Sequence, residues 1–94
     1  MKPPEFPIYV ALLVGPAVWR MGYAREITCD ARMELAGSFG TSTDLLSAMR
    51  GGQRVDVLLL DYALAETDSD GVLLISLLRQ RYPGTRILLA SAHD

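Results

Sequence analysis

Residues 56–61 read DVLLLD, a run of aliphatic side chains with an aspartate at each end. A short apolar run of this composition is typical of a strand that is buried on both faces, as in a parallel sheet. A polar loop over residues 62–70 follows directly. The stretch therefore predicts a central strand over Val57–Leu60 with the Asp61 carboxylate at its carboxyl end, and a structural role for Asp56 at the other end.

The segments around this strand alternate between strand and helix patterns. Before it, we predict strands over Ile8–Val14 and Arg32–Phe39 and helices from Ala17 to about Asp30 and from Thr41 to Met49. After it, we predict a helix over Asp70–Arg81 and a strand over Ile87–Ala90. Such alternation, with short connections, indicates an α/β fold in which helices cover both faces of a parallel sheet.

The carboxyl ends of the strands are where function is expected. In open parallel sheets, ligands bind beyond these ends, at the point where the strand order reverses. Here the ends carry Val14 and Gly15, then Asp61, and finally Ser91. These positions define the candidate site.

The first helix carries apolar residues at regular spacing. Trp19, Tyr23 and Ile27 recur every four residues and predict an amphipathic helix. Cys29 follows them and is expected to be a small core or boundary residue. Because it is the only cysteine, and His93 the only histidine, the sequence offers neither an internal disulfide nor a zinc ligand set, and a reducing cytoplasm is the natural location.

The last helix is apolar over more than half of its circumference. Leu74, Ile75 and Leu78 share one face, which should pack on the sheet. Leu73 and Leu77, four residues apart, lie beside that face, where a two-layer protein normally carries polar residues. We therefore expect either that the core extends over Leu73 and Leu77 or that they form an interface with a partner.

Length and charge narrow the function classes. The 94 residues make at most one small domain. The net charge is −2 with no run of like charges, so we expect no direct nucleic-acid binding. The apolar run after the proline-rich start is shorter than the ~18 residues of a membrane span, and we expect no membrane insertion. Residues 1–7, MKPPEFP, are interpreted as a flexible lead-in.

DVLLLD, the polar loop and then DGVLLISLLRQRYPGTRILLASA over residues 70–92 resemble the receiver domain of bacterial response regulators, particularly those of LuxR-type transcription factors. The likeness extends over Ile8–Ala92 and includes Arg20 and Gly22. It implies a flavodoxin-like (CheY-like) doubly wound parallel sheet of strand order 2-1-3-4. On this interpretation residues 8–94 are a partial receiver domain, which lacks the final α-β-α part.

The resemblance also implies roles for individual residues. Asp61 matches the aspartate that accepts a phosphoryl group from a histidine kinase. Ser91 matches the hydroxyl residue that contacts this group and switches position, and Ala92 matches its small neighbour. The backbone carbonyl of Ala63 matches a main-chain ligand of Mg²⁺, so Asp61 and Ala63 are the candidate metal ligands.

The sequence departs from the family at the metal site. Val14 and Gly15 stand where two adjacent acidic residues are usual, and the family's lysine-bearing fifth strand would lie beyond residue 94. Mg²⁺ favours oxygen ligands in octahedral geometry, and phosphoryl transfer depends on neutralising negative charge. We therefore expect no resident cofactor, with weak Mg²⁺ binding and weak phosphorylation. The acids at 66, 68 and 70 are an alternative source of ligands.

Three functions follow in order of preference. The first is an atypical receiver of a two-component system, not an enzyme, which controls an output domain through protein contact. Its partners would be a histidine kinase or another regulatory protein and a second copy of the chain, because the last strand is an apolar edge; the DNA-binding output domain would lie outside this chain. The second is a conventional receiver phosphorylated on Asp61. The third is a fragment of an α/β nucleotide-binding or hydrolytic enzyme, although its usual motifs are missing from the sequence.

Overall fold

The computed structural model of the chain describes residues 7–61 and 69–90, without the side chains of 69–72. The elements within these ranges are β1 (Ile8–Leu13), α1 (Ala17–Thr28), β2 (Met33–Phe39), α2 (Ser42–Arg50), β3 (Val57–Asp61), α4 (Ser69–Arg81) and β4 (Arg86–Ala90). Each predicted strand and helix is therefore confirmed, with ends shifted by one or two residues. Of the predicted lead-in over residues 1–7, all but Pro7 lies outside the described residues.

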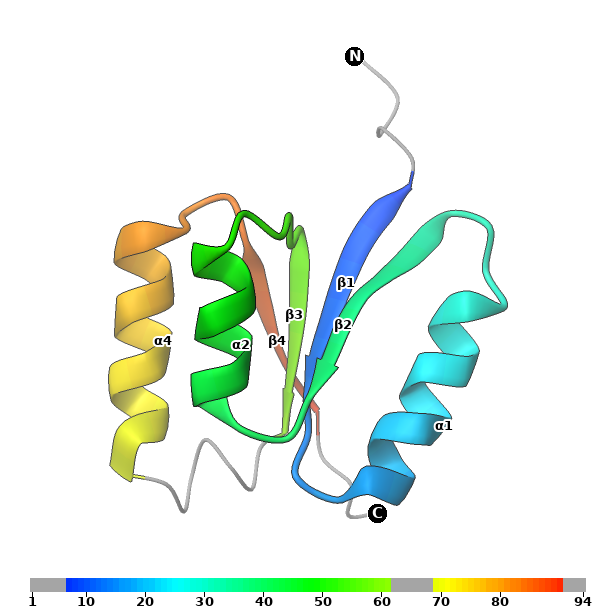
Figure 1. Cartoon of the computed structure of the whole chain (residues 1–94), viewed down its shortest axis with the longest axis horizontal. Helices are drawn as coiled ribbons and strands as arrows, with labels where there is room; N and C mark the ends of the chain where they lie inside the picture. The colour runs from blue at the N-terminus through cyan, green and yellow to red at the C-terminus, as the bar shows by residue number, and fades with distance from the viewer. Residues whose placement is uncertain (1–6, 62–68, 91–94) are drawn as a thin grey trace.

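The strands form one parallel sheet in the order β2-β1-β3-β4, as the sequence predicted. Helices α2 and α4 cover one face of this sheet, and α1 covers part of the other (Figure 1). From β2 at one edge of the sheet, the chain passes β1 to reach β3 on its other side, so the reversal of strand order lies between β1 and β3. The carboxyl ends of β1 and β3 are thus neighbours, which is where this fold class places ligands.

The larger core lies between the sheet and helices α2 and α4. Its buried residues are Ala11, Leu13, Leu45, Met49, Val55, Leu58, Leu60, Leu74 and Leu78, and Ile75 packs against them. The alternation of side chains along a strand explains the contribution of the sheet, since Leu13 and Leu60 point to the same face. The predicted inner face of the last helix, Leu74, Ile75 and Leu78, is confirmed.

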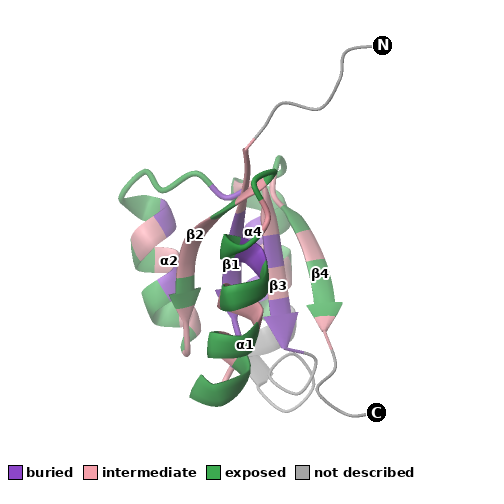
Figure 2. Cartoon of the chain, turned by 90° about the vertical axis from the view of Figure 1, so that its right-hand side faces the viewer, coloured by how far each residue is buried: buried purple, intermediate pink, exposed green. Residues whose placement is uncertain are grey.

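The smaller core lies under α1 and includes residues of β1, β2 and β3 but none of β4. Ile27 is buried there with Val10, Leu12 and Val14, and Tyr23 packs against them. Helix α1 packs on β1 and β2, and Figure 2 shows that it does not reach across to β4.

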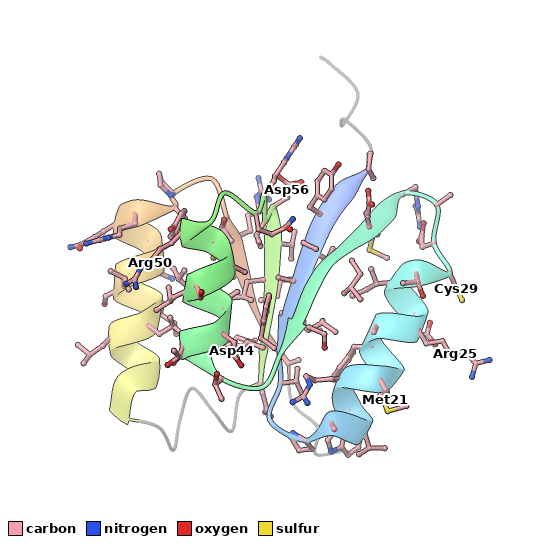
Figure 3. The ribbon with its side chains drawn as sticks, in the orientation of Figure 1. Met21, Arg25, Cys29, Asp44, Arg50 and Asp56 are labelled. Atoms are coloured by element: carbon pink, nitrogen blue, oxygen red, sulfur yellow. The ribbon has the colours of Figure 1, made fainter. Side chains whose placement is uncertain are left out.

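Two expectations about the apolar residues of α1 are wrong. Trp19 is 44% exposed, because the apolar stripe contacts the sheet only from Tyr23 onward. Cys29 is exposed rather than a core or boundary residue. Figure 3 shows it on the outer side of α1 together with Met21 and Arg25.

Local signals explain where α2 begins and ends. The Thr41 hydroxyl accepts a hydrogen bond from the backbone N–H of Asp44 at 3.2 Å, which caps the first turn. Gly51 and Gly52 follow the last turn, and Gly52 has a φ of 100°. This left-handed conformation favours glycine and turns the chain toward β3.

Asp56 joins three strands at the amino end of the sheet. Its Oδ2 accepts a hydrogen bond from the N–H of Tyr9 at 2.9 Å, and its own N–H donates to the carbonyl of Tyr9 at 2.8 Å. Its carbonyl accepts from the N–H of Arg86 at 2.9 Å. The structure therefore gives Asp56 the structural role expected for it.

Candidate functional site

Asp61 ends β3 and lies between the carboxyl ends of its two neighbouring strands. It pairs with Ala90 of β4, and because Leu60 pairs with Leu13, the next residue on the other side is Val14. Its side chain is 7% exposed, and it is the one buried polar residue among the described side chains. A buried carboxylate needs a partner, and Asp61 is engaged in a polar or electrostatic contact.

The position beside Asp61 is apolar. Val14 is 2% exposed and belongs to the core under α1, and its backbone N–H donates to the carbonyl of Phe39 at 3.1 Å. Gly15 follows with no side chain. The carboxyl end of β1 therefore presents methyl groups and backbone, and no carboxylate, to the neighbourhood of Asp61.

Arg20 brings a positive charge to this end of β1. Its Nη1 donates to the carbonyl oxygen of Val14 at 2.8 Å and to that of Gly15 at 2.7 Å. Gly40, just after β2, leaves room for the guanidinium, since a Cβ there would lie 2.7 Å from the same nitrogen. The sequence marked Arg20 only as a position shared with the resembling family. The sequence signal for this contact was the position of Arg20, six residues after Val14 and five after Gly15, which lets a long side chain in the first turn of α1 reach back to the strand end.

The described residues around the end of β1 do not fit a Mg²⁺ ion. Among the described side chains, those of residues 7–61 and 73–90, no group of three or more His, Cys, Asp or Glu is arranged to hold a metal ion. The carbonyl oxygens of Val14 and Gly15 already accept hydrogen bonds from a cation. The Ala63 carbonyl and the acids at 66 and 68 lie outside the described residues, as do Ser91 and Ala92, and the side chain of Asp70 is not described either.

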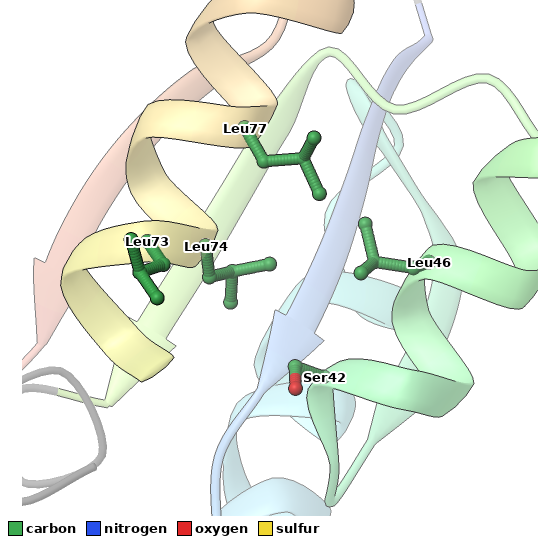
Figure 4. Close-up of a pocket in the computed structure, with 5 residues that line it drawn as sticks. All are labelled: Ser42, Leu46, Leu73, Leu74 and Leu77. Carbon is green, nitrogen blue, oxygen red and sulfur yellow. The ribbon is translucent and has the colours of Figure 1, made fainter. Parts of the chain in front are cut away.

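The predicted interface residues lie elsewhere, on the face covered by α2 and α4. Leu73 is 66% exposed, and Leu77 is half-buried. Both line a groove between the two helices, together with Leu74 of α4 and with Ser42 and Leu46 of α2 (Figure 4). The described part of the chain contains no helix with the length and apolar character needed to span a membrane.

No protein-family model matches the chain, and no curated protein sequence matches it. Solved structures do match it. The isolated REC domain of RcsB from Salmonella enterica serovar Typhimurium, in the presence of the phosphomimetic BeF3⁻, superposes with a TM-score of 0.77 over 93% of this chain at 18% identity. The fold is that of a response-regulator receiver domain.

Longer RcsB structures give the same result for the receiver fold. RcsB from the same organism, bound to promoter P1flhDC in the presence of BeF3⁻, matches 94% of this chain with a TM-score of 0.77 and 19% identity. A further RcsB structure matches 96% of this chain with a TM-score of 0.78. The chain spans 63% of the isolated receiver domain and 44% of these longer chains. The predicted resemblance is therefore confirmed at the level of the fold.

Proposed function

We propose that this chain is a receiver-type signalling module that acts through protein–protein contact and is phosphorylated on Asp61 weakly or not at all. It is not an enzyme in this proposal. The observation that carries the proposal is the end of β1, where buried Val14 and its neighbour Gly15 lie beside Asp61 and their carbonyl oxygens accept hydrogen bonds from Arg20.

The charge balance of phosphoryl transfer supports weak phosphorylation. An anionic donor must approach the Asp61 carboxylate, and the reaction depends on cations placed to neutralise the transition state. Mg²⁺ prefers carboxylates and other oxygen ligands in octahedral geometry, and the described end of β1 supplies neither carboxylate nor free carbonyl. The guanidinium of Arg20 carries a single positive charge and is already held by two carbonyl groups.

Intact-mass measurement after incubation with acetyl phosphate and Mg²⁺ tests this proposal, with Asp61→Asn as the control. We expect no phosphoryl adduct on the unmodified chain. An adduct that disappears in Asp61→Asn would support the alternative, a conventional receiver phosphorylated by a histidine kinase.

Restoring the missing carboxylates gives the complementary test. The double variant Val14→Asp with Gly15→Asp is expected to bind Mg²⁺ more tightly than the unmodified chain in a calorimetric titration, because it places two carboxylates beside Asp61. Equal and tight binding by both chains would contradict the proposal and point to the loop acids at 66 and 68 as ligands.

The outer strand supports a second copy of the chain as one partner. Among the described strands, β4 has a neighbour on one side only, and its Leu88 and Leu89 are 54% and 53% exposed. Open apolar strand edges associate by strand pairing. An antiparallel pair of β4 strands, centred on Leu88, would also keep the Arg86 side chains of the two copies apart.

Light scattering over a range of concentrations tests this homodimer. We expect the mass of a dimer at high concentration, and a monomer for Leu88→Lys, because a charge on an edge strand opposes pairing. A compact monomer at every concentration would exclude the homodimer.

The remaining partners follow from the same proposal. The signal would come from a histidine kinase or another regulatory protein in the cytoplasm. The output would be a DNA-binding domain outside these residues, since RcsB structures with this fold are bound to promoter DNA. The third alternative, a nucleotide-binding or hydrolytic enzyme, gains no support from the site.

A further inference from the structure

The walls of the groove between α2 and α4 carry matching rows of side chains. Each row has three positions at a spacing of four residues, which places them on one side of a helix. The rows are Ser42, Leu46 and Arg50 on α2, and Leu73, Leu77 and Arg81 on α4. Both rows therefore run from small or apolar side chains to an arginine.

The direction of the helices brings the two arginines to the same end. Helices α2 and α4 both begin near the carboxyl ends of the strands and run side by side toward the amino ends (Figure 1). Figure 3 shows Asp44 and Arg50 at opposite ends of α2. The groove thus has an apolar half, shown in Figure 4, and a basic end at the last turns of both helices.

The charges at the basic end are available to a partner. Arg50 and Arg81 are exposed, and the last turn of α4 also contains Arg79. Within the described residues, ion pairs involve only other arginines, Arg32 and Arg54. Some of the positive charge offsets the negative ends of the two helix dipoles. The interaction with the helix dipoles does not explain why small or apolar side chains precede the arginine in each of the two rows.

The size of the groove favours the side chains of a protein. Its volume is about 240 Å³, below the range of about 300–1,000 Å³ that is usual for small-molecule sites. Leu73 on its rim is 66% exposed. An apolar floor also distinguishes this groove from a nucleic-acid site, where phosphate contacts dominate affinity.

We propose that this groove binds an amphipathic helix of a partner protein, lying antiparallel to α2 and α4. The partner's apolar side chains, one helical turn apart, fill the space between Leu46 and Leu77. Acidic residues in its first turn face Arg50 and Arg81. This orientation sets the positive end of the partner's dipole against the negative ends of α2 and α4, and acidic side chains are favoured in the first turn of a helix. The inference deepens the proposed function and rests on its premise that the chain acts by protein contact.

The probe is a pair of labelled synthetic peptides of about 16 residues, long enough to form a helix. Both carry leucines at positions i, i+4 and i+7. One has three glutamates in its first turn, and the other has them in its last turn. Fluorescence anisotropy is expected to show tighter binding of the first peptide. NMR amide shifts on binding are expected at α2 and α4 and not at α1.

Matched variants separate the apolar and the charged parts of the groove. Leu73→Ser is expected to weaken binding about ten-fold, because an apolar contact is lost. Met21→Ser removes an apolar side chain of similar exposure, 72% against 66% for Leu73, from α1 and should leave binding unchanged. Arg50→Gln or Arg81→Gln should weaken binding about three-fold at low salt. Arg25→Gln, which changes the last-turn arginine of α1, is the control.

The results of these binding experiments also distinguish the proposed helix from other possible ligands of the groove. Equal binding of the two peptides, or no effect of Leu73→Ser, would overturn the proposal. Groove shifts that grow with protein concentration in the absence of peptide would assign the groove to a second copy instead. Binding of a leucine-free acidic peptide with equal affinity would reduce the site to a basic surface. Phosphorylation of Asp61 is measured independently, so the failure of that part of the proposed function would not be confused with a failure here.

Discussion

At the level of the single residue, Arg20 places a positive charge at the carboxyl end of β1. Here a guanidinium from α1 reaches the carbonyl oxygens of Val14 and Gly15 at 2.8 and 2.7 Å. The cation is therefore part of the chain, and the loop between β1 and α1 is closed by it.

Removing this cation should loosen the fold. We expect Arg20→Met to lower the free energy of unfolding by about 1–3 kcal/mol, the range for hydrogen bonds from a charged donor. Urea denaturation measures the change. Arg25→Met, on the exposed side of α1, is the control and should change stability by less than about 0.5 kcal/mol. Equal effects of the two substitutions would show that the Arg20 contacts contribute nothing.

A second single-residue effect concerns the turn after α1. Asp30 accepts hydrogen bonds from the side chain and the backbone N–H of Arg32, which lower the pKa of Asp30 from 3.8 to about 2. A carboxylate with a lowered pKa stabilises the fold above its unfolded pKa, and this contribution is lost as the pH falls from about 4 toward 2. Arg32→Gln should raise the pKa of Asp30 toward 3.8 in an NMR titration. An unchanged value would assign the shift to the backbone contact alone.

At the scale of the element, the ends of the helices could be predicted from the sequence, but the part of each helix that packs on the sheet could not. Thr41 and the Gly51-Gly52 pair mark the ends of α2 through local chemistry that is written in the sequence. The spacing of Trp19 and Tyr23 shows only that they share a side of α1. It does not show whether another element of the structure covers that side. In α1 the residues from Tyr23 onward contact the sheet, whereas Trp19, one turn earlier, does not belong to the core.

Two glycines in and next to helices should respond in opposite directions to alanine. Gly22 lies within α1 with nothing within 4 Å of an added Cβ, so Gly22→Ala should stabilise the protein by about 0.5–1 kcal/mol. Gly52 also has open space but a φ of 100°, so Gly52→Ala should destabilise it by about 1–2 kcal/mol. Thermal unfolding measures both. Changes of the same sign would contradict this assignment of backbone conformation.

At the scale of the whole molecule, the fold gathers charges that the sequence disperses. The chain has a net charge of −2 and no basic run. Nevertheless, the last turns of α2 and α4 and the first residue of β4 bring arginines to one end of the molecule. Asp61 could be predicted as a strand end because its sequence neighbours are apolar. The α2–α4 groove could not, because the rows that line it come from helices whose relative direction only the fold defines.

Helix α1 does not reach across its face of the sheet to β4, and this has a consequence for how the chain opens. β1 has a strand on each side and helices over both faces, whereas β4 has one strand neighbour and exposed leucines. Amide hydrogen exchange should therefore be slowest in β1 and fastest in β4, since local opening is easiest where few apolar contacts must break. Similar protection in both strands would mean that the chain opens only as a unit. If the gradient exists, a protease or chaperone in the cell meets residues 86–90 first, and a partner that covers this strand also prolongs the lifetime of the protein.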